Sequence, residues 1–137
     1  MHSRQIFVTE EDSERLQQII RSAAAASSKD WEHLDMLQHE LDRAEVVPSE
    51  EIPADVVTMN SRVLLRNLDT GIETTYTLVF PRDANVAQGR ISILAPIGTA
   101  MIGYRAGDEI VSRSPAGEKR FEVRKVLFQP EAAAIAA

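Results

Sequence analysis

Three acidic residues that are close in the sequence are the first candidates for chemistry. Asp30, Glu32 and Asp35 follow a run of small residues, 23–28, where one predicted helix gives way to the next. Carboxylates gathered at such a tip are suited to holding a divalent cation. Acidic residues are also favoured in the first turn of a helix, and Asp30 alone is a good N-cap. Two interpretations stay open, metal placement and helix capping, and capping is the simpler.

The other motifs that could carry chemistry are incomplete. Gly98 and Gly103 have the spacing that opens a phosphate-binding loop, but Tyr104 and Arg105 stand where Lys and Ser or Thr should follow. His33 and His39 are six residues apart on one predicted helix, which places them on different faces, and His2 lies at the terminus, so their spacing does not bring metal ligands together. The sequence contains no nucleophile elbow and no metalloprotease motif. We therefore expect no enzyme activity, no catalytic residue, no metal site and no cofactor.

Two helices are predicted to position the acidic cluster. The first begins at Thr9, with Asp12 three residues later in the manner of a capping box, and the second is capped by Ser28 or Asp30 and ends before Pro48. The apolar stripes of the two helices are Leu16, Ile19, Ile20 and Ala23, and Leu34, Leu37, Leu41 and Ala44. An antiparallel hairpin of about 22 Å follows from the rise of 1.5 Å per residue. Because its stripes are narrow, one end should pack on the rest of the protein.

The remainder of the chain has the pattern of a β-rich domain. The predicted strands, rich in β-branched and aromatic residues, cover 56–59, 63–68, 74–80, 90–94, 110–112 and 121–127. A short helix is predicted from Pro96 to near Gly103, and the tail from residue 131 onward is expected to fray.

The expected fold class is therefore α+β. An antiparallel helical hairpin at 1–47 is followed by a linker with two prolines at 48–54. A twisted antiparallel sheet with one short helix packed on it then makes up the domain at 55–137.

Composition and charge restrict the class of function. A hydrophobic content of 44% with 26% charged residues is typical of a globular protein, and no apolar run is long enough to span a membrane. Residues 1–55 hold five Lys/Arg and thirteen Asp/Glu, a net charge of −8, whereas residues 56–137 hold ten and eight, a net charge of +2. The acidic N-terminal segment argues against general nucleic-acid binding. The alternative explanation of its charge is that it keeps an exposed pair of helices soluble. Without cysteine or an apolar leader, a cytoplasmic location is expected.

One stretch resembles a known family. Residues 91–110, ISILAPIGTAMIGYRAGDEI, closely resemble the C-terminal domain of the bacterial transcript-cleavage elongation factors, the Gre family. Residues 41–44, 55–63 and 129–132 resemble a narrower family, the regulators of nucleoside diphosphate kinase called Rnk. The resemblance covers 34–132 and is weak in 1–33.

The resemblance implies a fold and a partner. The fold would be a domain of the FKBP type, and the partner would be RNA polymerase, held by the coiled-coil rim of its largest subunit at the mouth of the secondary channel. Ala95, Pro96, Ile97, Gly98 and Met101 would make the contact, with Ile97 and Met101 as a small apolar anchor. The alternative is that Ile97 and Met101, four residues apart, face the core.

The departures from the Gre pattern decide the expected activity. Cleavage factors carry a long hairpin that presents carboxylates to the catalytic Mg²⁺, and this hairpin is shorter. We therefore expect a non-catalytic regulator that competes with Gre-type factors and affects nucleoside diphosphate kinase levels indirectly. Stimulation of transcript cleavage by Asp30, Glu32 and Asp35 is the alternative. Prolyl isomerase activity would rest on fold analogy alone. No membrane partner and no sequence-specific nucleic-acid partner are expected.

Overall fold

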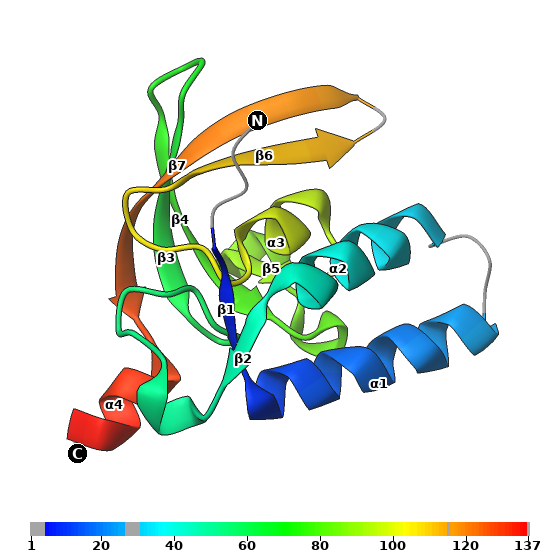
Figure 1. Cartoon of the computed structure of the whole chain (residues 1–137). Helices are drawn as coiled ribbons and strands as arrows, with labels where there is room; N and C mark the ends of the chain where they lie inside the picture. Colours follow the sequence, from blue (N-terminus) through cyan, green and yellow to red (C-terminus); the bar gives the residue numbers. More distant parts are fainter. Residues whose placement is uncertain (1–4, 27–30, 115, 137) are drawn as a thin grey trace.

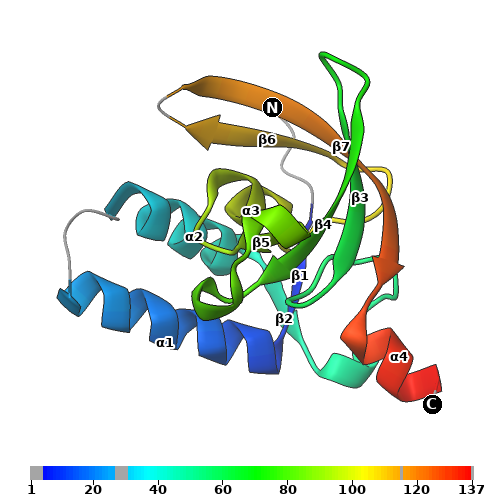
Figure 2. The same ribbon diagram turned by 180° about the vertical axis from the view of Figure 1, so that it is seen from behind.

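The computed structural model describes residues 5–26, 31–114 and 116–136 and has the predicted α+β fold (Figure 1). Its elements are β1 (Phe7–Thr9), α1 (Glu10–Ala26), α2 (Trp31–Arg43), β2 (Glu45–Val47), η1 (Ser49–Glu51), β3 (Arg62–Asn67), β4 (Glu73–Val79), η2 (Pro81–Asp83), η3 (Val86–Gln88), β5 (Arg90–Ser92), α3 (Pro96–Met101), β6 (Glu109–Ser114), β7 (Gly117–Phe128) and α4 (Pro130–Ala136), where η marks a 3-10 turn. Figure 2 shows α3 lying between the curled sheet and the hairpin of α1 and α2.

The main sheet has the strand order β5-β4-β3-β7-β6. Its pairs are antiparallel except β4 with β5, so the predicted antiparallel sheet is confirmed, with one parallel pair at this edge. The connection between these strands is not a tight hairpin turn, because η2 and η3 carry the chain back to the start of β5. In β3, Val63 and Leu65 face the core while Arg62 and Arg66 are exposed, the alternation expected of a strand with one solvated face.

The predicted strand at 56–59 does not form. Val56 makes one isolated bridge with Arg105, and the chain then turns, with the Thr58 N–H donating to Ser61 Oγ at 2.9 Å. Asn60 adopts a positive φ of 67°, which ends the extended run. The apolar residues of this segment are buried in the core, which is why their pattern is typical of a strand.

The base of the hairpin is closed by a parallel pair of strands that the sequence analysis did not predict. Phe7 in β1 pairs with Glu45 in β2, and the Phe7 N–H also donates to the carbonyl of Gly103 at 3.2 Å. The hairpin therefore packs on the rest of the protein at this end, as its narrow apolar stripes indicated. Leu16, Leu37 and Leu41 of the hairpin belong to the same hydrophobic cluster as buried residues of the sheet and α3. The cluster contains Val8, Leu16, Leu37, Leu41, Val57, Met59, Val63, Leu65, Leu78, Ile93, Met101, Ile102, Ile110, Phe121 and Val123.

Asp12 connects α1 to the segment before β3. Its N–H donates to Thr9 Oγ1 at 3.1 Å, which confirms the predicted helix start. Its carboxylate does not complete a capping box, because Oδ2 instead accepts the Met59 N–H at 3.1 Å. Burial is the main reason that the pKa of Asp12 rises to about 6, and the negative charge of Glu131 adds to it.

The C-terminal tail is a helix, so the prediction that it frays is wrong. Gln129 holds it, because its Nε2 donates to the carbonyls of Pro53 and Val56 at 2.8 Å each, while its Oε1 accepts the Ala132 N–H at 3.1 Å. Glu131 adds a second attachment by accepting the hydroxyl of Thr58 at 2.7 Å. These bonds attach α4 to the segment that follows η1 and leads into the sheet.

We predict that Asp12→Asn stabilises the protein at neutral pH. The folded pKa of about 6 lies above the ordinary 3.8, so the charged carboxylate costs stability as pH rises through this window. Asn keeps an acceptor for the Met59 N–H without the charge. The advantage in unfolding free energy should be absent near pH 4 and grow toward pH 7, by at most about 1.4 kcal/mol per pH unit.

Urea unfolding of both proteins from pH 4 to 8 measures this difference, with Glu14→Gln as the control. Glu14 is an exposed carboxylate on the same helix, and its variant should show little pH-dependent difference from the wild type. An Asp12→Asn advantage that does not change with pH would contradict the burial argument.

Candidate functional site

The loop between β5 and α3 is fixed in place by short-range hydrogen bonds. The Leu94 N–H donates to Ser92 Oγ and the Ala95 N–H to the Ser92 carbonyl, both at 3.0 Å. Ala95 is extended at the N-cap of α3, and Pro96 follows at the first helical position, where its fixed φ suits the helix and its missing N–H costs nothing. The loop is therefore preorganised.

The five residues predicted to contact a partner have different environments. Ala95, Pro96 and Ile97 are half-buried and present part of their side chains at the surface. Gly98 is buried, and Met101 is 0% exposed in the core. For Met101 the structure therefore favours the core-facing alternative, because the inner face of α3 packs under the sheet. The surface available to a partner consists of Ala95, Pro96 and Ile97, which we call the α3 loop.

Gly98 is required by close packing of α3 on β5. A Cβ at this position would lie 2.1 Å from the carbonyl oxygen of Ser92, far inside van der Waals contact. The hydroxyl of Thr99 donates to the carbonyl of Ile93 at 2.6 Å and holds α3 to the residue that directly follows β5. Gly98 therefore supports the α3 loop from beneath and offers no side chain to a partner.

The hairpin is oriented against this region by a second group of contacts. Arg43, near the end of α2, pairs with Glu40 at 3.1 Å, and its guanidinium donates to the hydroxyl of Tyr104. The Arg43 guanidinium also lies 5.5 Å from the centre of the Tyr104 ring. Burial raises the pKa of Tyr104 above its usual value, so the hydroxyl stays a neutral partner.

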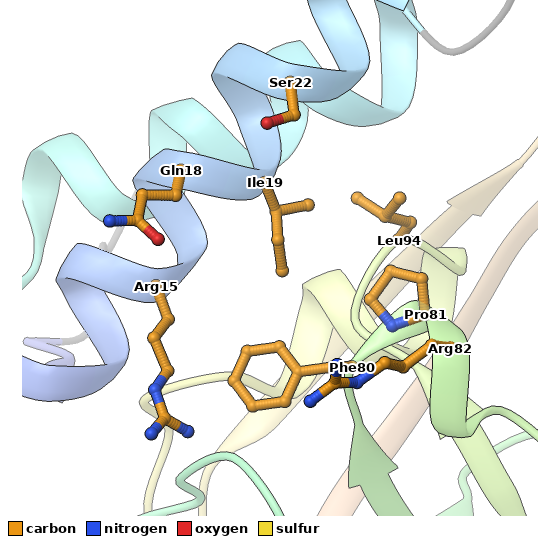
Figure 3. A pocket seen from close by; sticks show the side chains of 8 residues that line it. All are labelled: Arg15, Gln18, Ile19, Ser22, Phe80, Pro81, Arg82 and Leu94. Carbon is orange, nitrogen blue, oxygen red and sulfur yellow. The ribbon is translucent and has the colours of Figure 1, made fainter.

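A cleft of about 690 Å³ lies beside the α3 loop, between α1 and η2 (Figure 3). It is lined by Arg15, Gln18, Ile19, Ser22, Phe80, Pro81, Arg82 and Leu94. Leu94, which lines the cleft, directly precedes Ala95, so the cleft and the α3 loop are neighbours along the chain. We call this cleft the α1 groove. The sequence analysis missed it because residues from distant segments build its two walls, and the periodicity of α1 assigned Ile19 to helix packing.

Of the three acidic residues predicted at the hairpin tip, the described part of the structure includes the side chain of Asp35 alone. Asp30 lies outside the described residues, and Glu32 belongs to α2 but its side chain is not described. Asp35 is exposed one turn further along α2. Within 5–26, 31–114 and 116–136, no group of three His, Cys, Asp or Glu residues is arranged to hold a metal ion. No described helix is long and apolar enough to cross a membrane.

The chain is similar to known proteins in both of its parts. Residues 4–47 match the model of the Rnk N-terminus, and residues 52–128 match that of the transcription elongation factor GreA/GreB C-terminus. The chain is 40% identical over 129 residues to the regulator of nucleoside diphosphate kinase of Escherichia coli K12, which covers 93% of each protein.

Two elongation factors are also similar. The transcription elongation factor GreA of Desulfotalea psychrophila is 39% identical over 90 residues, which cover 66% of this chain and 56% of that factor. The solved structure of a prokaryotic transcription elongation factor GreA/GreB from Nitrosomonas europaea has a TM-score of 0.74 and 39% identity, covering 90% of this chain and all of that one.

We predict that Gly98→Ala destabilises the protein by about 2–3 kcal/mol, because the new methyl group forces α3 away from β5. Gly107→Ala is the matched control, since Gly107 has a φ of +97° but open space at its Cβ position. That variant tests backbone strain alone and should cost about 1 kcal/mol. Thermal or urea unfolding of both variants measures the difference. Equal losses would contradict the packing role of Gly98.

Proposed function

The chain belongs to the family of regulators of nucleoside diphosphate kinase, whose C-terminal part is shared with the GreA/GreB transcription elongation factors, and on this premise we propose that it is a non-catalytic regulator that binds RNA polymerase. The proposed site is the mouth of the secondary channel, with the α3 loop against the coiled-coil rim of the largest subunit. The observation that carries the proposal is the partly exposed, hydrogen-bonded loop within the matched residues 52–128.

The α3 loop has the properties of a small binding anchor. Pro96 restricts the backbone, and Ile97 adds a partly exposed apolar side chain that packs against the core on its other side. Preorganised apolar anchors of this kind bind well because little conformational entropy is lost on association. The Arg43–Tyr104 contact and the β1–β2 pair hold the hairpin next to the loop, so a partner would meet both as one rigid surface.

The length of the hairpin supports competition and not catalysis. α1 has 17 residues and α2 has 13, so the arms are about 25 Å and 20 Å long at 1.5 Å per residue. Their base is fixed by β1 and β2, which prevents the hairpin from sliding further into a channel. We propose that the protein occupies the docking site of Gre-type factors without delivering carboxylates to the active centre. An effect on nucleoside diphosphate kinase would then be indirect, through transcription.

We predict that the protein displaces a labelled GreA-type factor from core RNA polymerase in a titration. Pro96→Ala/Ile97→Asp should weaken displacement by about tenfold or more, because it removes the apolar anchor. Val86→Asp is the matched control, since Val86 is 84% exposed on the connection between β4 and β5 and should compete like the wild type. Thermal unfolding establishes that each variant is folded. Failure of the wild type to displace the factor would contradict the proposal.

A second prediction separates competition from catalysis. Added to arrested elongation complexes with Mg²⁺, the protein should not accelerate transcript cleavage, because its hairpin is short. A GreA factor in the same assay is the positive control. Acceleration that is lost when Asp30, Glu32 and Asp35 are all replaced by Ala would favour the alternative function, a transcript-cleavage factor.

A further inference from the structure

The α1 groove combines an apolar floor with a cationic rim. Ile19, Phe80 and Leu94 are half-buried and pack against the core, so their remaining surface forms the floor. Arg15 and Arg82 are exposed at the rim, and the described lining residues include no carboxylate. Figure 3 shows both guanidinium groups on the side of the groove where the Phe80 ring lies. A partly covered apolar surface edged by like charges is typical of a protein-binding surface.

The two arginines are prepared to bind a carboxylate. The Arg15 guanidinium lies 5.9 Å from the centre of the Phe80 ring, and its pairing with Glu11 at 3.2 Å joins two exposed side chains. Such an exposed pair contributes little and is easily exchanged for a better partner. No ion pair involving Arg82 is found among the described residues. A guanidinium held by a ring still offers N–H groups for a two-point contact with a carboxylate.

The shape of the groove fits a helix. The α1 wall is formed by positions 15, 18, 19 and 22, which lie on one face over two helical turns, about 10 Å at 1.5 Å per residue. The volume of about 690 Å³ accommodates a few side chains and not a whole domain. An amphipathic helix that lays one apolar side chain between acidic neighbours matches both the floor and the rim.

We infer that the α1 groove binds an acidic amphipathic helical segment of RNA polymerase, next to the segment held by the α3 loop. The inference rests on the proposed function and extends the interface by one contact. The apolar residue of the helix packs on Ile19 and Leu94, while its Asp or Glu side chains meet Arg15 and Arg82. The complementary charge of the rim, and the position of Leu94 directly before the α3 loop in the chain, select this occupant.

The test compares charge reversals at and away from the groove. Arg15→Glu/Arg82→Glu should weaken binding to core RNA polymerase by about tenfold or more and reduce the dependence of binding on salt. Arg66→Glu/Arg113→Glu, with the same change in net charge on β3 and β6, should bind within about threefold of the wild type. Thermal unfolding of both double variants establishes that they are folded.

A cross-link identifies what occupies the groove. The chain has no cysteine, so Ser22→Cys gives one reactive thiol on the groove wall. A photoactivated cross-linker on that thiol, in the complex with polymerase, should label a helical polymerase segment that contains Asp or Glu. A label on nucleic acid, on a second copy of this chain or on a segment without acidic residues would overturn the inference.

The outcomes separate the groove from the proposed function. If the groove variant binds like the wild type while Pro96→Ala/Ile97→Asp fails to bind, the groove is not part of the interface and the proposed function stands. If the wild type does not bind polymerase, the proposed function fails and the inference fails with it. If the groove variant and the Arg66→Glu/Arg113→Glu control lose binding equally, the effect is one of net charge and the inference is wrong.

Discussion

The rest of the structure depends on one shared hydrophobic core. The apolar stripes of the hairpin are too narrow to bury one another. Leu16, Leu37 and Leu41 are instead buried in one cluster with Met59 and Met101 from the other part of the chain. Truncating a leucine buried in this way to alanine typically costs 2–5 kcal/mol, which is a large share of the stability of a domain of this size. The hairpin and the sheet therefore hold one fixed relative position.

This packing also determines what the surface presents. The inner face of α3 is buried with Gly98, Thr99 and Met101, which leaves Pro96 and Ile97 partly exposed on the other face. Ile19 and Leu94 lie at the edge of the same core, where α1 stops short of covering the chain around η2. The α3 loop and the α1 groove are thus two exposed edges of a single packed unit, and both have a rigid support.

Much of the fold is predictable from local patterns. Helix periodicity indicated α1 and α2, β-branched runs indicated most of the sheet, and Pro96 marked the start of α3. Features that depend on distant contacts were missed. The β1–β2 pair has three residues in each strand, too few for a periodic signal, and α4 is held by hydrogen bonds from Gln129 to a segment more than 70 residues earlier.

The candidate site was predictable only where it depends on consecutive residues. The α3 loop came from a resemblance over consecutive residues, whereas spacing alone could not decide whether Met101 is buried. The α1 groove could not be predicted from the sequence, because Arg15 and Phe80 come together only in the folded chain. Asp30 lies outside the described residues, so the acidic tip stays a prediction from sequence.

The central claim is that this chain binds RNA polymerase through the α3 loop. A cryo-electron microscopy reconstruction of the protein bound to core RNA polymerase tests it most directly. We expect Ala95, Pro96 and Ile97 in contact with the coiled-coil rim and the hairpin in the mouth of the secondary channel. Density for the protein elsewhere on the enzyme, with the rim unoccupied, would contradict it.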